Sequence, residues 1–96
     1  MIKEILMEGE ENAQSSRDIC NLLKLTPREL TIAIERERRA GAPIAATSSS
    51  ANPGYFLAPD RETMLHYCSR LEHREQEISR TRLACLDTAA ALPPRA

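Results

Sequence analysis

The chain has 96 residues, of which 42% are hydrophobic and 28% charged, and its formal net charge is −1. This composition predicts one folded, soluble domain with a small core, and it excludes a disordered chain and an enzyme built around a sizeable pocket. No segment is long and apolar enough to span a membrane. Three cysteines without a CxxC pair argue against a secreted disulfide framework, so we expect a cytoplasmic protein.

The charge is distributed unevenly along the chain. Residues 1–15 contain one lysine and four glutamates, residues 16–42 contain six basic and four acidic side chains, and residues 43–96 contain six of each. A near-neutral total argues against nucleic-acid binding, because domains that bind DNA are usually basic. The positive segment nevertheless coincides with the helices described next, which weakens that objection.

Two short helices are expected in the first 25 residues. An apolar cluster near the start, followed by Gly9, predicts a first helix that ends near that glycine. The Ser15–Ser16 pair can cap a second helix, in which Ile19, Leu22 and Leu23 recur at helical spacing. This second helix is expected to end at about Lys24.

The segment 26–41 contains the signals of a third helix at both of its ends. Thr26 can cap its N-terminus, Pro27 suits the first helical position, and Glu29 can complete a capping box. Arginines in its last turn and Gly41 just beyond suit its C-terminus. Two helices separated by so few residues form the pattern of a helix-turn-helix, in which the helix 26–40 is the one that reads DNA.

An uncharged segment runs from Gly41 to Pro59. Residues 43–47 and 55–57 have strand character. The SSSANPG sequence between them is rich in turn-forming residues. The segment therefore predicts a β-hairpin at about 43–58. A hairpin that directly follows a reading helix is the wing of a winged helix.

A long helix is expected over residues 60–92, beginning at Asp60 and ending before Pro93–Pro94, with residues 93–96 as a tail. Its apolar residues follow a 3-4 spacing that Glu75 and Arg82 interrupt. We expect this helix to form a homodimer, and the candidate contact residues are Leu71, Ile78, Cys85 and Leu86. The alternative is a helix that bends back as a hairpin or frays beyond about Arg80.

The fragments RRAGAPI and GYFLAP resemble the winged-helix module at the front of biotin-repressor-type regulators. The resemblance covers about Ser15 to Pro59 and implies a winged helix-turn-helix domain at 1–59. At Glu37 that pattern has an apolar residue facing the core, so either the helix is rotated or Glu37 lies at the rim of the core. With the long helix included, the chain resembles small phage and prophage proteins described as DNA-binding.

The expected fold is therefore mostly α with a small β-hairpin: a winged helix-turn-helix followed by a long C-terminal helix. The expected function is duplex DNA binding, as a phage-type transcriptional regulator or as a recombination or replication accessory. Nine residues are the candidate DNA contacts: Arg17, Arg28, Thr31, Ile32, Glu35, Arg36, Arg39, Ser49 and Asn52. The alternatives are a solvated helix face with a Glu35–Arg39 pair and no DNA contact, and a protein–protein adaptor.

Catalysis is not expected, because no phosphate-binding glycine loop and no nucleophile–base pair can be identified from the spacing. His66 and His73 lack the paired spacing of zinc ligands and are expected on a helix surface. The sequence therefore predicts no cofactor, no metal, no membrane contact and no small-molecule ligand.

Overall fold

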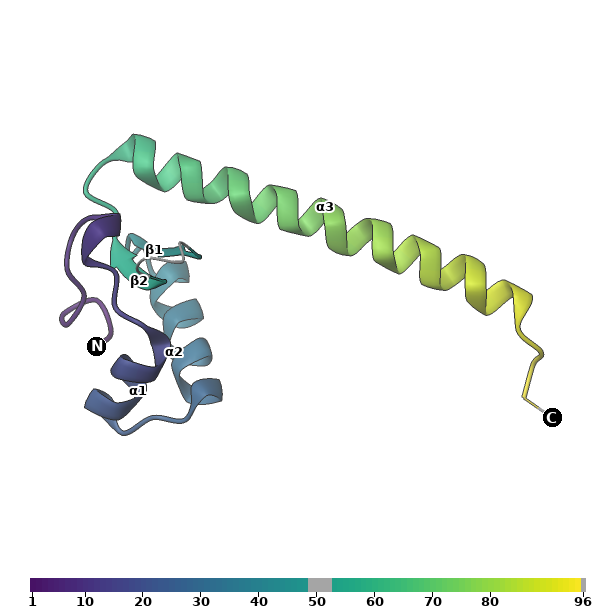
Figure 1. Ribbon diagram of the computed structural model, residues 1–96, viewed down its shortest axis with the longest axis horizontal. Helices are drawn as coiled ribbons and strands as arrows, with labels where there is room; N and C mark the ends of the chain where they lie inside the picture. Colours follow the sequence, from purple (N-terminus) through teal and green to yellow (C-terminus); the bar gives the residue numbers. More distant parts are fainter. Residues whose placement is uncertain (49–52, 96) are drawn as a thin grey trace. The chain divides into compact units, whose positions relative to one another are not determined.

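The computed structural model describes residues 1–48 and 53–95. Figure 1 shows the elements in chain order. These are a 3₁₀ turn η1 (Glu10–Asn12), helix α1 (Ser16–Leu23), helix α2 (Pro27–Arg39), strands β1 (Ile44–Thr47) and β2 (Gly54–Leu57), and helix α3 (Arg61–Ala91). The chain divides into two compact units, Met1–Leu65 and His66–Ala96. The predicted class, mostly α with a small hairpin and a long C-terminal helix, is confirmed.

Local capping bonds define the pair α1–α2. The Ser15 hydroxyl accepts from the backbone N–H of Asp18 at 3.1 Å, and Lys24, at φ 56°, ends α1 in the left-handed conformation. Thr26 and Glu29 then form the predicted capping box, with bonds of 3.2 Å and 2.8 Å. Because these bonds join residues only three positions apart, the sequence is sufficient to locate the start of each helix.

Strands β1 and β2 form the predicted antiparallel hairpin, in which Ile44 is paired with Leu57 and Thr47 with Gly54. Arg38, near the end of α2, fastens this hairpin to the helix. Its Nε donates to the carbonyl of Ile44 at 2.9 Å, and its guanidinium lies 5.8 Å from the centroid of the Tyr55 ring. The hairpin is therefore tied directly to the last turn of α2.

The prediction of a first helix near the N-terminus is wrong: residues 1–14, all of them described, contain no α-helix, and the 3₁₀ turn η1 is their one helical element. Instead this segment runs beside β2. The N–H of Leu57 donates to Met7 at 2.9 Å, and Gln14 and Tyr55 exchange two backbone bonds of 2.9 Å and 2.8 Å. Pairing with β2 outcompetes a helix here. Without it, the backbone donors and acceptors at the edge of β2 would be unpaired, whereas an isolated helix of two turns is unstable.

The main core cluster of the first unit consists of aliphatic side chains. It joins the N-terminal segment, both short helices, the residues after α2 and the hairpin. Its buried members are Ile2, Leu6, Ile19, Leu30, Ile34, Ala42 and Ile44. Ile2 is fully buried although it belongs to no regular element. The N-terminal segment is thus part of the core.

Glu37 lies at the rim of that core, where it holds the N-terminal segment. Its carboxylate accepts from the backbone N–H groups of Ile2 and Lys3 at 2.7 Å and 3.0 Å and lies 3.3 Å from the Met1 ammonium. Burial raises the pKa of Glu37, but these three donors outweigh it, so that the pKa is lower than its ordinary value. The ionised carboxylate is therefore the form that the folded chain prefers.

The stability of the first unit is expected to depend on the ionisation of Glu37. Because the folded state lowers this pKa, the contribution is complete above the ordinary glutamate pKa, about 4.3, and is lost as the pH falls through the folded value. Glu37→Gln is expected to cost about 1–2 kcal/mol at pH 7 and to reduce the loss of stability on acidification. Urea unfolding at pH 7 and pH 4, with exposed Glu72→Gln as the control, measures both effects, and equal pH profiles would contradict this role.

Candidate nucleic-acid interface

Helix α2 has one buried and one exposed face. Leu30 and Ile34 are each 1% exposed and pack in the core. Arg28, Ile32, Glu35 and Arg39 recur three and four residues apart, which places them along one stripe, and all four are exposed. Ile32 retains 47% exposure although it is a large apolar residue. The side chains of this exposed face therefore do not pack in the core of the chain.

A shallow hollow of about 410 Å³ lies on this face. It is lined by Thr31, Ile32, Glu35, Arg36 and Arg39, five of the nine predicted contacts. The Thr31 hydroxyl donates within the helix to the carbonyl of Pro27 at 3.0 Å, so its oxygen remains a possible acceptor. The lining thus combines the apolar side chain of Ile32 with the charged side chains of Glu35, Arg36 and Arg39.

Glu35 is the one acidic side chain in that lining, and it faces two arginines. Its carboxylate oxygens lie 3.7 Å from Arg39 and 3.8 Å from Arg38. The Arg39 side chain is 83% exposed, so this pair contributes little to stability and can separate at small cost. The predicted Glu35–Arg39 pair is confirmed, and it leaves Arg39 available to another anion.

The other predicted arginines are also exposed. Arg17 lines a second hollow of about 320 Å³, which α1 forms with the turn before α2. Pro27, at the start of α2, lines the same hollow, and Arg28 follows it in sequence. The structure therefore places Arg17 near the N-terminal end of α2, and Arg36 and Arg39 toward its C-terminal end.

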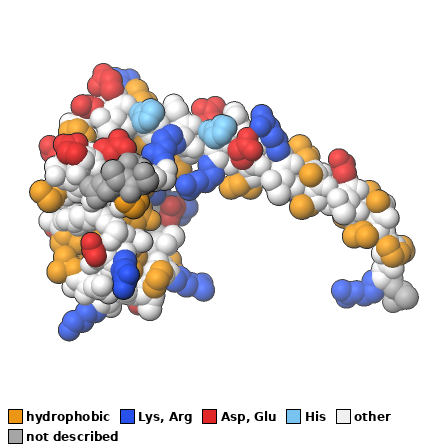
Figure 2. All heavy atoms as spheres, viewed as in Figure 1, with side chains coloured by type: hydrophobic (Ala, Val, Ile, Leu, Met, Phe, Trp, Pro, Cys, Tyr) orange, Lys and Arg blue, Asp and Glu red, His pale blue; other side chains and the backbone are white. Residues whose placement is uncertain are grey.

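The hairpin carries acidic neighbours. The Thr47 hydroxyl, at the end of β1, donates to the Glu10 carboxylate at 2.6 Å, and Thr47 is buried. Figure 2 shows acidic side chains gathered over η1, whereas basic side chains lie over α1 and the neighbouring end of α2. Ser49 and Asn52, the two predicted hairpin contacts, lie outside the described residues. The basic surface of the first unit thus belongs to its helices.

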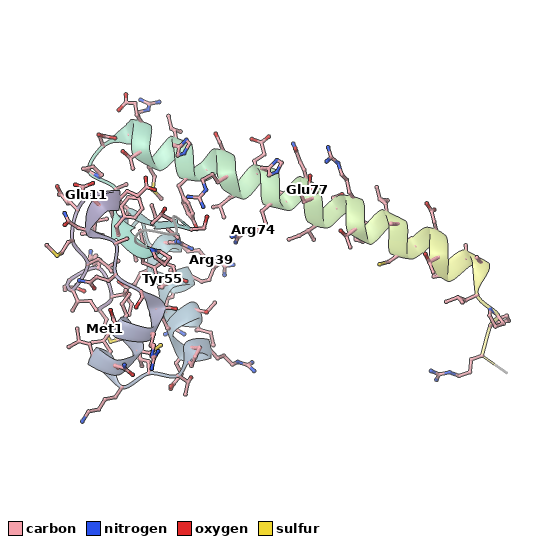
Figure 3. All side chains as sticks on the ribbon, viewed as in Figure 1. Met1, Glu11, Arg39, Tyr55, Arg74 and Glu77 are labelled. Atoms are coloured by element: carbon pink, nitrogen blue, oxygen red, sulfur yellow. The ribbon has the colours of Figure 1, made fainter. Side chains whose placement is uncertain are left out.

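Sequence reasoning did not assign Arg38 its role of joining α2 to the hairpin. Figure 3 shows Tyr55 on the hairpin and Arg39 near the end of α2. Arg38 precedes Arg39, but its side chain is only 20% exposed. No local pattern distinguishes these two adjacent arginines, because their difference depends on where β1 and Tyr55 lie.

The predicted dimer contacts on α3 are accessible. Ile78 is 61% exposed, Leu86 is 55% exposed, and Cys85 is exposed. Leu71 is less accessible at 38%.

His66 and His73 are also on this helix, and in the described part of the chain no three His, Cys, Asp or Glu side chains are grouped as a metal site would require. In residues 1–48 and 53–95 no helix combines the length and apolarity needed to cross a membrane.

The first unit contains two helices joined by a short turn and followed by a β-hairpin, and the second helix has an exposed face that bears arginines. No protein-family model, curated protein or solved structure matches the chain.

Proposed function

We propose that the first unit binds duplex DNA by placing the exposed face of α2 in the major groove. The observation that carries this proposal is the exposed stripe of α2, which bears Arg28 at one end and Arg39 at the other, opposite the buried Leu30 and Ile34. A helix of this kind fits the major groove, where base edges present a distinct pattern for each base pair.

The roles of the individual residues follow from their places on the helix. Arg28 and Thr31 are near the N-terminus of α2, which is the part of a reading helix that meets base edges, and Ile32 supplies an apolar contact. Arg36 and Arg39 are suited to phosphates, as is Arg17 on α1. Glu35 accepts from a cytosine amine or is repelled by the DNA backbone. The proposed biological role is a cytoplasmic, phage-type transcriptional regulator or a recombination or replication accessory.

A homodimer formed through α3 belongs to the same proposal, because two copies would present two reading helices to two half-sites. A second candidate function is a protein–protein adaptor. The contact of Glu10 with Thr47 favours it, since this carboxylate places negative charge beside the hairpin. The two functions differ in their response to salt.

The test is to measure the affinity of the whole protein for a fluorescent mixed-sequence duplex by fluorescence polarisation, at about 50 mM and at about 200 mM salt. The three arginines suited to phosphates would give a slope near −2.7, and hence a loss of affinity of about 40-fold over this range. The expected result is binding that weakens by about this factor. A folded protein that does not bind at about 50 mM salt would overturn the DNA proposal and favour the adaptor.

A further inference from the structure

Helix α3 has an exposed apolar stripe with two charged interruptions. Leu71, Ile78 and Cys85 are seven residues apart, and Glu75 and Arg82 fall between them at 3-4 spacing, so that all five share one face. From Leu71 to Arg95 every side chain is exposed, apart from half-buried Ser79. In proteins, burial of one face is what ordinarily stabilises a helix.

The surroundings of Ile78 are those of a contact surface. Ile78 is 61% exposed and lies in a hollow of about 390 Å³, lined also by Arg74, Glu77, Thr81 and Arg82. Figure 3 shows two of these, Arg74 and Glu77, projecting from the middle of α3. Glu77 pairs with Arg80 at 2.7 Å along the helix, and both groups are largely exposed. The apolar surface at Ile78 is thus framed by charges, which a partner must match.

We propose that α3 pairs antiparallel with α3 of a second copy, around a two-fold axis near residues 78 and 79. Glu75 and Arg82 are equally far from this axis and opposite in charge. A two-fold axis makes each contact occur twice, so that Glu75 of each copy lies beside Arg82 of the other. The same axis places Leu71 level with Leu86 of the second copy. The two interruptions of the stripe are therefore complementary to each other.

The opposite orientation does not have this complementarity. In a parallel, in-register pair, Glu75 lies beside Glu75 of the second copy, and Arg82 lies beside Arg82 of the second copy. Like charges at the centre of a helix pair disfavour that arrangement, whereas polar residues at such positions specify orientation and register when they are matched. The occupant is thus a second copy of this chain because the face is complementary to itself.

This inference rests on the homodimer part of the proposed function and is independent of DNA binding. In the antiparallel pair, residue 66 of one copy lies level with residue 91 of the other, so the two copies of residue 66 are about 38 Å apart at 1.5 Å per residue.

A charge exchange tests the pairing of Glu75 with Arg82. Sedimentation equilibrium of the whole protein is expected to show a dimer that Glu75→Arg and Arg82→Glu each weaken by about tenfold, and that the double variant restores. In a parallel dimer, like charges face each other at positions 75 and 82 in the wild type, in each single variant and in the double variant. Single variants that dimerise as strongly as the wild type would therefore contradict the antiparallel pairing. A wild-type protein that is monomeric at all concentrations would overturn the proposal, while the duplex-binding assay would still test DNA binding.

A distance measurement determines the orientation directly. A spin label is attached at Ala91→Cys after the three native cysteines are replaced by serine. Pulsed electron paramagnetic resonance is expected to give a separation of about 40 Å, from the rise of about 1.5 Å per residue. A separation below about 20 Å would overturn the antiparallel pair, since residues at one level of two packed helices lie only about 10 Å apart between axes. Far-ultraviolet circular dichroism checks that each variant remains helical.

Discussion

The double variant Arg28→Ala/Arg39→Ala is expected to bind duplex DNA about 100-fold more weakly than the wild type at low salt, because a base contact contributes about 1–3 kcal/mol and a phosphate contact adds to it. The two side chains are exposed at opposite ends of the same stripe of α2, so their removal leaves Leu30 and Ile34 in the core. The slope of affinity against salt is expected to decrease by about one to two. Fluorescence polarisation across a salt series measures both quantities.

Two further variants separate this effect from a general loss of positive charge. Arg80→Ala/Arg95→Ala removes the same charge from the second unit and is expected to leave duplex binding nearly unchanged. Glu35→Ala removes the carboxylate that lies 3.7 Å from Arg39, and it is expected to increase affinity. If both double variants weakened binding equally, α2 would have no special role, and non-specific attraction would explain the binding.

Replacing Gly54 by alanine is expected to lower the free energy of unfolding of the first unit by about 3 kcal/mol. Gly54 has φ 142°, which alanine rarely adopts. A Cβ atom here would also clash with the carbonyl oxygen of Gln14 and lie 2.8 Å from the backbone nitrogen of Ser15. These are backbone atoms in the segment that pairs with Tyr55, so they have little room to move.

Gly41 provides the matched control for this steric effect. Its φ of 101° is also unfavourable for alanine, but a Cβ atom there would meet nothing within 4 Å. Gly41→Ala is therefore expected to cost only about 1 kcal/mol, from the backbone alone. Urea unfolding of both variants measures the difference. Equal losses would show that the close approach of β2 to Gln14 and Ser15 does not constrain the protein.

Local signals were sufficient to locate α1, α2, the hairpin and α3. The caps of α1 and α2 are bonds between residues three positions apart, and Asp60 caps α3 in the same manner by accepting from Thr63 at 2.8 Å. Such bonds form wherever the sequence places the two partners, without help from the remainder of the chain. The exposed face of α2 was predictable for the same reason, because helical periodicity alone separates Leu30 from Arg28.

The tertiary structure decided the features that depend on distant partners. Residues 1–14 contain enough apolar side chains for a short helix, yet they lie along β2 because Leu57 and Tyr55, more than 40 residues later, offer unpaired backbone groups. Glu37 anchors the N-terminal segment through the backbone of Ile2 and Lys3, which are 35 and 34 positions away in sequence. Arg38 bonds to β1, whereas the neighbouring Arg39 stays exposed. A local pattern cannot encode these choices, since each depends on which donor or acceptor the folded chain brings within reach.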